Sequence, residues 1–264
     1  MNQLRQLSLR QRDQLLIVFA LAAIVFLSWW YLVQLNNQMN TMPAMNGMQG
    51  MGTKNAGIHP WTPTDFLMMF IMWAVMMVAM MVPSAMRMVM IYSHVVAKEK
   101  SQNSLITPTL AFALGYVVVW SLFSLVATFL QWGLESAALL SPMMVTTSSS
   151  LGAGLLIAAG IYQLTPLKDT CLKYCQSPAM FIAAHYQKGV IGAFKNGLTH
   201  GVYCLGCCWL LMGLLFVGGV MNLIWILAIS LFVLAEKLLP VKMVTGRITS
   251  LIMVLAGVVY LANS

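Results

Sequence analysis

Seven apolar runs, most of them long enough to cross a lipid bilayer, constrain this chain more than any other feature. A transmembrane helix needs about 20 consecutive apolar residues. The runs are Leu15–Leu35, Phe66–Tyr92, Thr107–Gln131, Met144–Leu164, Leu198–Val217, Val220–Leu234 and Ile248–Ala262. Hydrophobic residues make up 60% of the chain and charged residues only 8%, which excludes an ordinary soluble globule. We therefore predict an all-α fold, a polytopic bundle of about seven transmembrane helices.

The basic residues predict the orientation of this bundle, because cytoplasmic loops collect Lys and Arg. If the seven runs alternate across the membrane, 13 of the 14 basic residues fall on one side and only Lys54 falls on the other. The 13 are Arg5, Arg10, Arg12, Arg87, Lys98, Lys100, Lys168, Lys173, Lys188, Lys195, Lys237, Lys242 and Arg247. We predict a bacterial inner-membrane protein with a cytoplasmic N-terminus and an outer C-terminus. Its net charge of +8 follows from this topology, so nucleic acid is not expected as a partner.

Three regions follow from this topology. Residues 1–35 form a short cytoplasmic segment and the first transmembrane helix, and residues 66–264 form a six-helix membrane domain. Between them, residues 36–65 form an outer arm without helical or strand periodicity. The arm carries a methionine at every third position, namely Met39, Met42, Met45, Met48 and Met51. Because an extramembrane arm has no core to fill, this spacing favours binding of a soft metal, although methionine surfaces also bind peptides.

A second group of methionines lies on the apolar run that follows the arm. Met68, Met72, Met76 and Met80 are four residues apart, which places them on one face of a helix, and Met69, Met77 and Met81 form a neighbouring row. One interpretation is a ladder of thioether ligands that passes Cu(I) inwards to Pro83, where the helix is interrupted. The alternative is packing against lipid or against the core, where apolar side chains at this spacing are expected.

The cysteines form the sharper pattern. His200, Cys204, Cys207 and Cys208 project within a sector of roughly 100° on a helix, where they can supply ligands to Cu(I) or zinc. The pair Cys171 and Cys175 lies on the same predicted cytoplasmic side, where thiols stay reduced. The alternative is that these cysteines are small buried hydrophobes. Glu236, an ionisable residue at membrane depth, is a further candidate ligand, or it extends to the membrane interface together with Lys237.

Several motifs in these segments resemble an uncharacterised bacterial family of predicted metal-binding integral membrane proteins. They are Ala79–Ser84, Tyr162–Lys168 with Cys171 and Cys175, His200–Met212, Gly219–Asn222 and Ala235–Lys237. The resemblance runs from about Trp61 to Ser264, and the Cys-Leu-Gly-Cys-Cys-Trp stretch carries most of it. It implies metal binding and supplies no activity. The methionines of the arm lie outside these motifs.

Together these patterns favour a membrane copper-handling protein and not an enzyme. The arm captures Cu(I), the methionine helix conducts it, and the thiolates of Cys204, Cys207 and Cys208 receive it. Copper is the expected metal and zinc the alternative. Expected partners are the bilayer, the metal ion, and a copper donor or a membrane metalloenzyme. Two alternatives remain: an accessory or assembly subunit of a metalloenzyme, and a membrane thiol–disulfide oxidoreductase that uses the paired cysteines.

Overall fold

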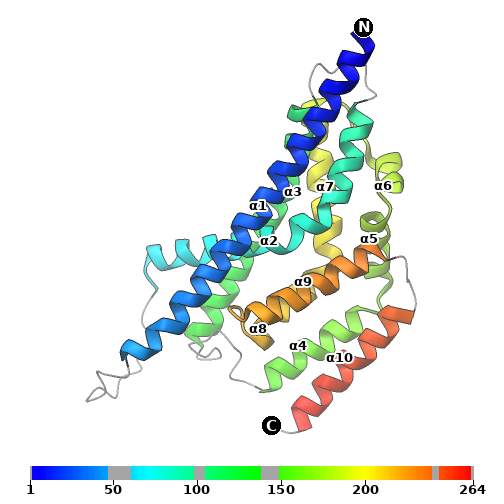
Figure 1. Cartoon of the computed structure of the whole chain (residues 1–264). Helices are drawn as coiled ribbons and strands as arrows, with labels where there is room; N and C mark the ends of the chain where they lie inside the picture. Colours follow the sequence, from blue (N-terminus) through cyan, green and yellow to red (C-terminus); the bar gives the residue numbers. More distant parts are fainter. Residues whose placement is uncertain (1, 47–60, 98–104, 138–148, 240–243, 263–264) are drawn as a thin grey trace.

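The computed structural model describes residues 2–46, 61–97, 105–137, 149–239 and 244–262, and these residues are almost entirely helical. No strand occurs within these ranges, so the all-α prediction is confirmed. The helices are α1 (Asn2–Asn46), α2 (Pro63–Val96), α3 (Ile106–Ser136), α4 (Ser149–Tyr162), α5 (Pro166–Gln176), α6 (Pro178–His185), α7 (Gly189–Gly213), α8 (Leu215–Gly218), α9 (Leu223–Leu238) and α10 (Val244–Ala262) (Figure 1).

Each of the seven apolar runs coincides with a helix, but not all of these helices have the length of a membrane span. Four stretches are long and apolar enough: Arg12–Gln38 within α1, α2, α3, and Gly189–Gly218, which includes α7 and α8. Helices α4 and α5 pass the same test only as a pair, and the pair is bent by 67° at the break between them. Helix α9 has 16 residues, and the apolar part of α10 is Ile248–Ala262.

The predicted irregular arm is partly wrong. Helix α1 does not end near Leu35 but continues to Asn46, so the first part of the arm is helical. Its methionines Met39, Met42 and Met45 lie on this extension. Residues 47–60, with Met48 and Met51, lie outside the described part of the chain. The division into three regions therefore stays a prediction.

Helix α2 begins with a capping box and contains a proline. The Thr62 side chain accepts a hydrogen bond from the Asp65 amide at 3.3 Å, and the Asp65 carboxylate accepts one from the Thr62 amide at 2.9 Å. Pro83 lies inside the helix, and Figure 1 shows α2 bent along its length. Near the proline, the Met81 carbonyl accepts hydrogen bonds from the hydroxyls of Ser84 at 2.8 Å and Tyr116 at 3.1 Å. Neighbouring side chains thus contribute polar contacts where the helix is interrupted.

Helices α3 and α7 pack closely side by side, and glycines allow their backbones to approach. A Cβ atom at Gly197 of α7 would overlap the carbonyl of Phe112, and one at Gly115 of α3 would overlap the carbonyl of Phe194. Small residues at helix crossings are typical of helices that pack in membranes. Helix α7 also packs on α5, while α2 packs on α1, α3 and α9. Helix α7 therefore packs directly on α3 and α5, and α3 in turn packs on α2.

Candidate metal centre

The methionine row on α2 faces the protein core and not its surface. Met68, at the start of the row, is 67% exposed, whereas the next positions are fully buried. The buried members are Met72, Met76, Met77, Met80 and Met81. They share one hydrophobic cluster with Cys204, Cys207 and Cys208. The row therefore packs in a sulfur-rich core and not against lipid, and both interpretations of it, ligand ladder and core packing, stay open.

Cys204 is the most highly connected thiol of the chain. Its Sγ lies 3.0 Å from the Tyr116 hydroxyl of α3 and accepts a hydrogen bond from the Lys237 ammonium of α9 at 2.9 Å. The ammonium also donates to the Ser84 hydroxyl of α2 at 3.1 Å. Cys204 is 1% exposed and Lys237 is 4% exposed, so these contacts are made away from solvent. Helices α3, α7 and α9 therefore meet at this sulfur atom, and α2 joins them through the Lys237 ammonium.

The remaining cysteines gather around Cys204. The thiols of Cys207 and Cys208 donate to the Cys204 carbonyl at 3.0 and 2.9 Å, one helical turn back along α7. From α5, the side chain of Cys175 lies within interacting distance of Cys204 and Cys207. The Cys171 sulfur approaches Gly206, where a Cβ atom would lie 2.8 Å away. The two cysteine motifs thus form one cluster that joins α5 to α7, and all five cysteines are free thiols.

The donor atoms of this cluster do not yet point at a common position. Within the described ranges, no three His, Cys, Asp or Glu side chains converge as a set of metal ligands. The reason is visible in the hydrogen bonds, because Cys207 and Cys208 turn their thiols to the backbone of their own helix. A rotation about the Cα–Cβ bond would redirect each thiol, since staggered side-chain rotamers are alternatives of similar energy.

His200 lies one turn before Cys204 on α7 and is packed between aromatic rings. Its ring centroid lies 5.7 Å from that of Tyr116, 5.9 Å from Phe112 and 5.2 Å from Phe181. The residue is 3% exposed, and its Nδ1 atom has no hydrogen-bond partner. His200 therefore lies on the same helix as Cys204, Cys207 and Cys208. No contact joins its ring nitrogens to a sulfur atom among the described hydrogen bonds.

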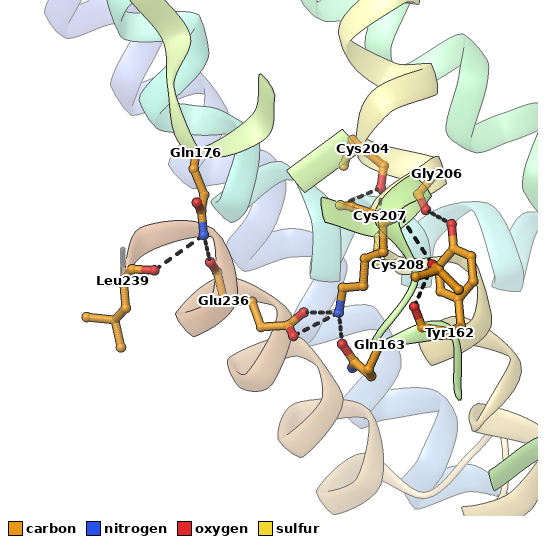
Figure 2. Close-up of polar contacts among 11 residues, drawn as sticks. Tyr162, Gln163, Gln176, Cys204, Gly206, Cys207, Cys208, Glu236 and Leu239 are labelled. Carbon is orange, nitrogen blue, oxygen red and sulfur yellow. Dashed lines mark hydrogen bonds and ion pairs between the residues drawn. The ribbon is translucent and has the colours of Figure 1, made fainter. Parts of the chain in front are cut away.

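Glu236 forms an ion pair with Lys168. Its carboxylate accepts hydrogen bonds from the Lys168 ammonium of α5 at 2.8 and 2.9 Å, and Lys237 points instead to Cys204. Figure 2 shows the side chains of Glu236 and Gln163 pointing toward each other, and Lys168 donates to both. This ion pair is buried, with 3% and 9% of the two side chains exposed. Glu236 is thus engaged in fixing α5 to α9, and we leave it out of the proposed ligands.

Two further contacts attach α4 and α5 to the helices around the cysteines. The Tyr162 hydroxyl at the end of α4 donates to the Gly206 carbonyl of α7 (Figure 2). At the end of α5, the Gln176 amide donates to the carbonyls of Glu236 at 2.7 Å and Leu239 at 3.4 Å. Helix α5, which carries Cys171 and Cys175, is therefore held at both of its ends.

Sequence reasoning did not find Tyr116 and Lys237. Lys237 was counted among the basic residues that set the topology, and Tyr116 lies within an apolar run without a motif of its own. Two signals pointed to the end of α9, namely the motif Ala235–Lys237 and the ionisable Glu236 beside an apolar run, and neither gave Lys237 a role at the cysteines. The partners of both residues became apparent only from the packing of α3 and α9 against α7.

The fold and the site define a helical protein with a buried cluster of thiols beside a row of buried thioethers. The model of one family, PpoB2, described as a copper chaperone, matches residues 70–260. The chain therefore belongs to this copper chaperone family. The match includes the methionine row from Met72, the whole cysteine cluster, and Lys237. Comparisons with curated proteins and with solved structures give no match.

Proposed function

We propose that this protein is an integral membrane chaperone for copper that holds Cu(I) as its cargo at the cysteine cluster. The observation that supports this most directly is the gathering of all five cysteines, four of them buried, in one cluster of α5 and α7. Soft thiolate and thioether ligands select Cu(I), whereas carboxylates suit harder ions. The carboxylate of Glu236 on α9 is paired with Lys168. Because thiolates suit zinc as well, copper is favoured over zinc by the thioether row beside the cluster and by the copper chaperone family.

The proposed ligands are ranked by their contacts. Cys204 is at the centre, and Cys175 and Cys207 are the thiols that interact with it from α5 and α7. Cys208 and Cys171 lie at the edges of the cluster and complete it after a change of rotamer. His200 is a further candidate, because its unpartnered Nδ1 leaves a donor atom unused.

The buried methionines supply the route to this cluster. The row from Met72 to Met80 descends α2 within the same core as the cysteines. It ends at Met81 and Ser84, whose groups contact Tyr116 and Lys237, the two partners of Cys204. Because thiolates bind Cu(I) more tightly than thioethers do, affinity rises along this route and favours uptake or delivery. Met42, Met45 and Met48 would capture the ion outside the bilayer.

The metal content of the detergent-purified, reduced protein tests the cysteine site. We expect near-stoichiometric Cu(I) in the wild type and its loss in the triple variant Cys204→Ser, Cys207→Ser, Cys208→Ser, because serine removes the soft donors. Copper and zinc are measured in the same anaerobic samples by elemental analysis. The variant Met88→Leu is a matched control, since Met88 is buried in a separate core cluster without a cysteine.

Copper retained by the triple variant would show that the metal binds elsewhere. Zinc in place of copper would replace the proposed cargo and leave the site intact. A protein without metal whose thiols cycle would instead indicate an oxidoreductase. This second function is favoured by one observation, namely that Cys175 meets Cys204 and Cys207 across two helices. Co-purification of a metalloenzyme would identify the protein as an accessory subunit.

The methionine row predicts a kinetic effect. In the variant Met72→Leu, Met76→Leu, Met80→Leu, we expect loading of Cu(I) to slow by about tenfold, which corresponds to about 1.4 kcal/mol in the barrier. Folding should change little, because exchange of Met for Leu conserves volume and usually costs less than about 1.5 kcal/mol. The transfer rate of Cu(I) from a chromogenic chelator to the purified protein measures this, with Met88→Leu as the control. Equal rates in both variants would reduce the row to core packing.

A further inference from the structure

Lys237 occupies an unusual position for a lysine near the end of an apolar helix. Its side chain turns into the protein, where the ammonium contacts the Cys204 sulfur at 2.9 Å and the Ser84 hydroxyl at 3.1 Å. The residue is 4% exposed. A lysine at the end of a membrane helix normally extends its ammonium to water, and this one does the opposite.

The counter-charge of this ammonium is not a carboxylate. Among the described residues, the neighbouring Glu236 pairs with Lys168, and no acidic side chain pairs with Lys237. A buried charge must be paired or hydrogen-bonded, because its desolvation costs several kcal/mol. Cys204 is the group at hydrogen-bond distance that can carry the opposite charge, and Cys207 and Cys208 add to the same electrostatic environment. Lys237 thus places a buried positive charge next to Cys204, a proposed metal ligand.

We propose that Lys237 is the residue that makes this site selective for a monovalent soft cation over a divalent one. This inference rests on the proposed function, since it assumes that Cys204 binds the cargo. The ammonium holds Cys204 in place and does not itself bind metal, so Lys237 is a positioning residue. With two thiolates and one Cu(I), the ammonium brings the buried site to a net charge of zero. A divalent ion in the same place would leave one positive charge uncompensated.

The contribution of the Lys237 ammonium to the preference for Cu(I) over Zn(II) does not depend on how many thiolates bind the ion. Coulomb repulsion between the ammonium and the ion scales with the charge of the ion, so it acts twice as strongly on Zn(II) as on Cu(I). Attraction between the ammonium and the thiolates is the same for both ions. When the ion lies about 4 Å from the ammonium in a protein interior, one additional unit of charge on the ion is enough to change its binding constant by well over tenfold.

The test compares Cu(I) and Zn(II) affinities of the full-length protein in detergent, each by competition with a chelator of known affinity. In Lys237→Met and Lys237→Gln, we expect the ratio of Cu(I) to Zn(II) affinity to fall by at least about tenfold. Lys237→Arg, which keeps the charge, should stay near the wild-type ratio. Tyr116→Phe removes the other contact to the Cys204 sulfur without a change of charge, so it should also keep the ratio.

The outcomes separate this inference from the proposed function. If Cys204→Ser binds Cu(I) as the wild type does, the proposed site is wrong. If copper depends on Cys204 but the ratio is unchanged in both neutral Lys237 variants, only the role of Lys237 is overturned. A ratio that falls equally in Lys237→Arg would also overturn it, because the effect would then follow from shape. Circular dichroism and gel filtration identify which neutral variant is folded, and either one suffices.

Discussion

Gly197→Ala is expected to prevent the correct packing of α3 against α7. The new methyl group would overlap the carbonyl of Phe112 and lie 3.0 Å from its Cα atom, and backbone atoms cannot move aside as a flexible side chain can. Overpacking usually costs about 1–3 kcal/mol, and a clash with backbone belongs at the upper end of that range or beyond it. Since α7 carries Cys204, Cys207 and Cys208, the displaced helix should also lose Cu(I) binding. The yield of monodisperse protein and its denaturant unfolding in detergent measure the effect.

Gly133→Ala provides the matched control on α3. Nothing lies within 4 Å of a Cβ atom at that position, so alanine should be neutral or slightly stabilising, as expected for glycine replaced in a helix. Equal stability of Gly197→Ala and Gly133→Ala would show that α3 and α7 do not approach as closely as described.

Lys168→Met is expected to destabilise the protein by about 3–5 kcal/mol, because it leaves the buried carboxylate of Glu236 without its counter-charge. The same substitution removes the hydrogen bond to Gln163, so the attachment of α5 to α9 weakens. Helix α5 carries Cys171 and Cys175, and their distance from Cys204 depends on this attachment. We therefore expect weaker Cu(I) binding together with the loss of stability. Denaturant unfolding and chelator competition measure the two effects on one preparation.

A double-mutant cycle distinguishes the ion pair from simple packing. The variant Lys168→Met, Glu236→Met removes both charges, and it should recover most of the stability lost in either single variant. Additive losses in the double variant would contradict a direct interaction between the two residues. Lys173→Met is a suitable control on the same helix, since no ion pair is described for it.

Periodicity alone predicted most of the fold. The apolar runs coincide with α1, α2, α3, α4, α7 and α8, α9, and α10, because long apolar segments have few alternatives to helix formation. The segment that follows Leu35 was predicted to be irregular, yet α1 continues to Asn46. Its polar composition and glycines suggested a loop, and its Asn, Thr and Pro residues are poor helix formers. Met39, Met42, Ala44 and Met45 are good helix formers, and a helix that has already been nucleated is extended at lower cost than a new one. The residue at which a helix ends depends on such local preferences, which a hydropathy profile does not measure.

The candidate site was predicted as a list of sulfur atoms and not as an arrangement. Spacing placed Cys204, Cys207 and Cys208 on one face of a helix, and it placed Met72 and Met80 on another. What spacing cannot predict is which faces meet, because this depends on helix crossings that glycines such as Gly197 permit. The partners of Glu236 and Lys237 show the same limit. Adjacent residues Glu236 and Lys237 point to different helices, and each finds its partner there.

The connection from α5 through α6 to α7 determines how a bound metal ion would affect the stability of the fold. The cysteines of α5 and those of α7 belong to separate segments, joined through α6 and the break that follows His185. An ion bound by both Cys175 and Cys204 would cross-link α5 to α7. Because a ligand that binds only the folded form stabilises it, such an ion would stabilise the packing of α5 on α7. Bound Cu(I) would then contribute to the stability of the protein, and release of the ion would weaken the attachment of α5 to α7.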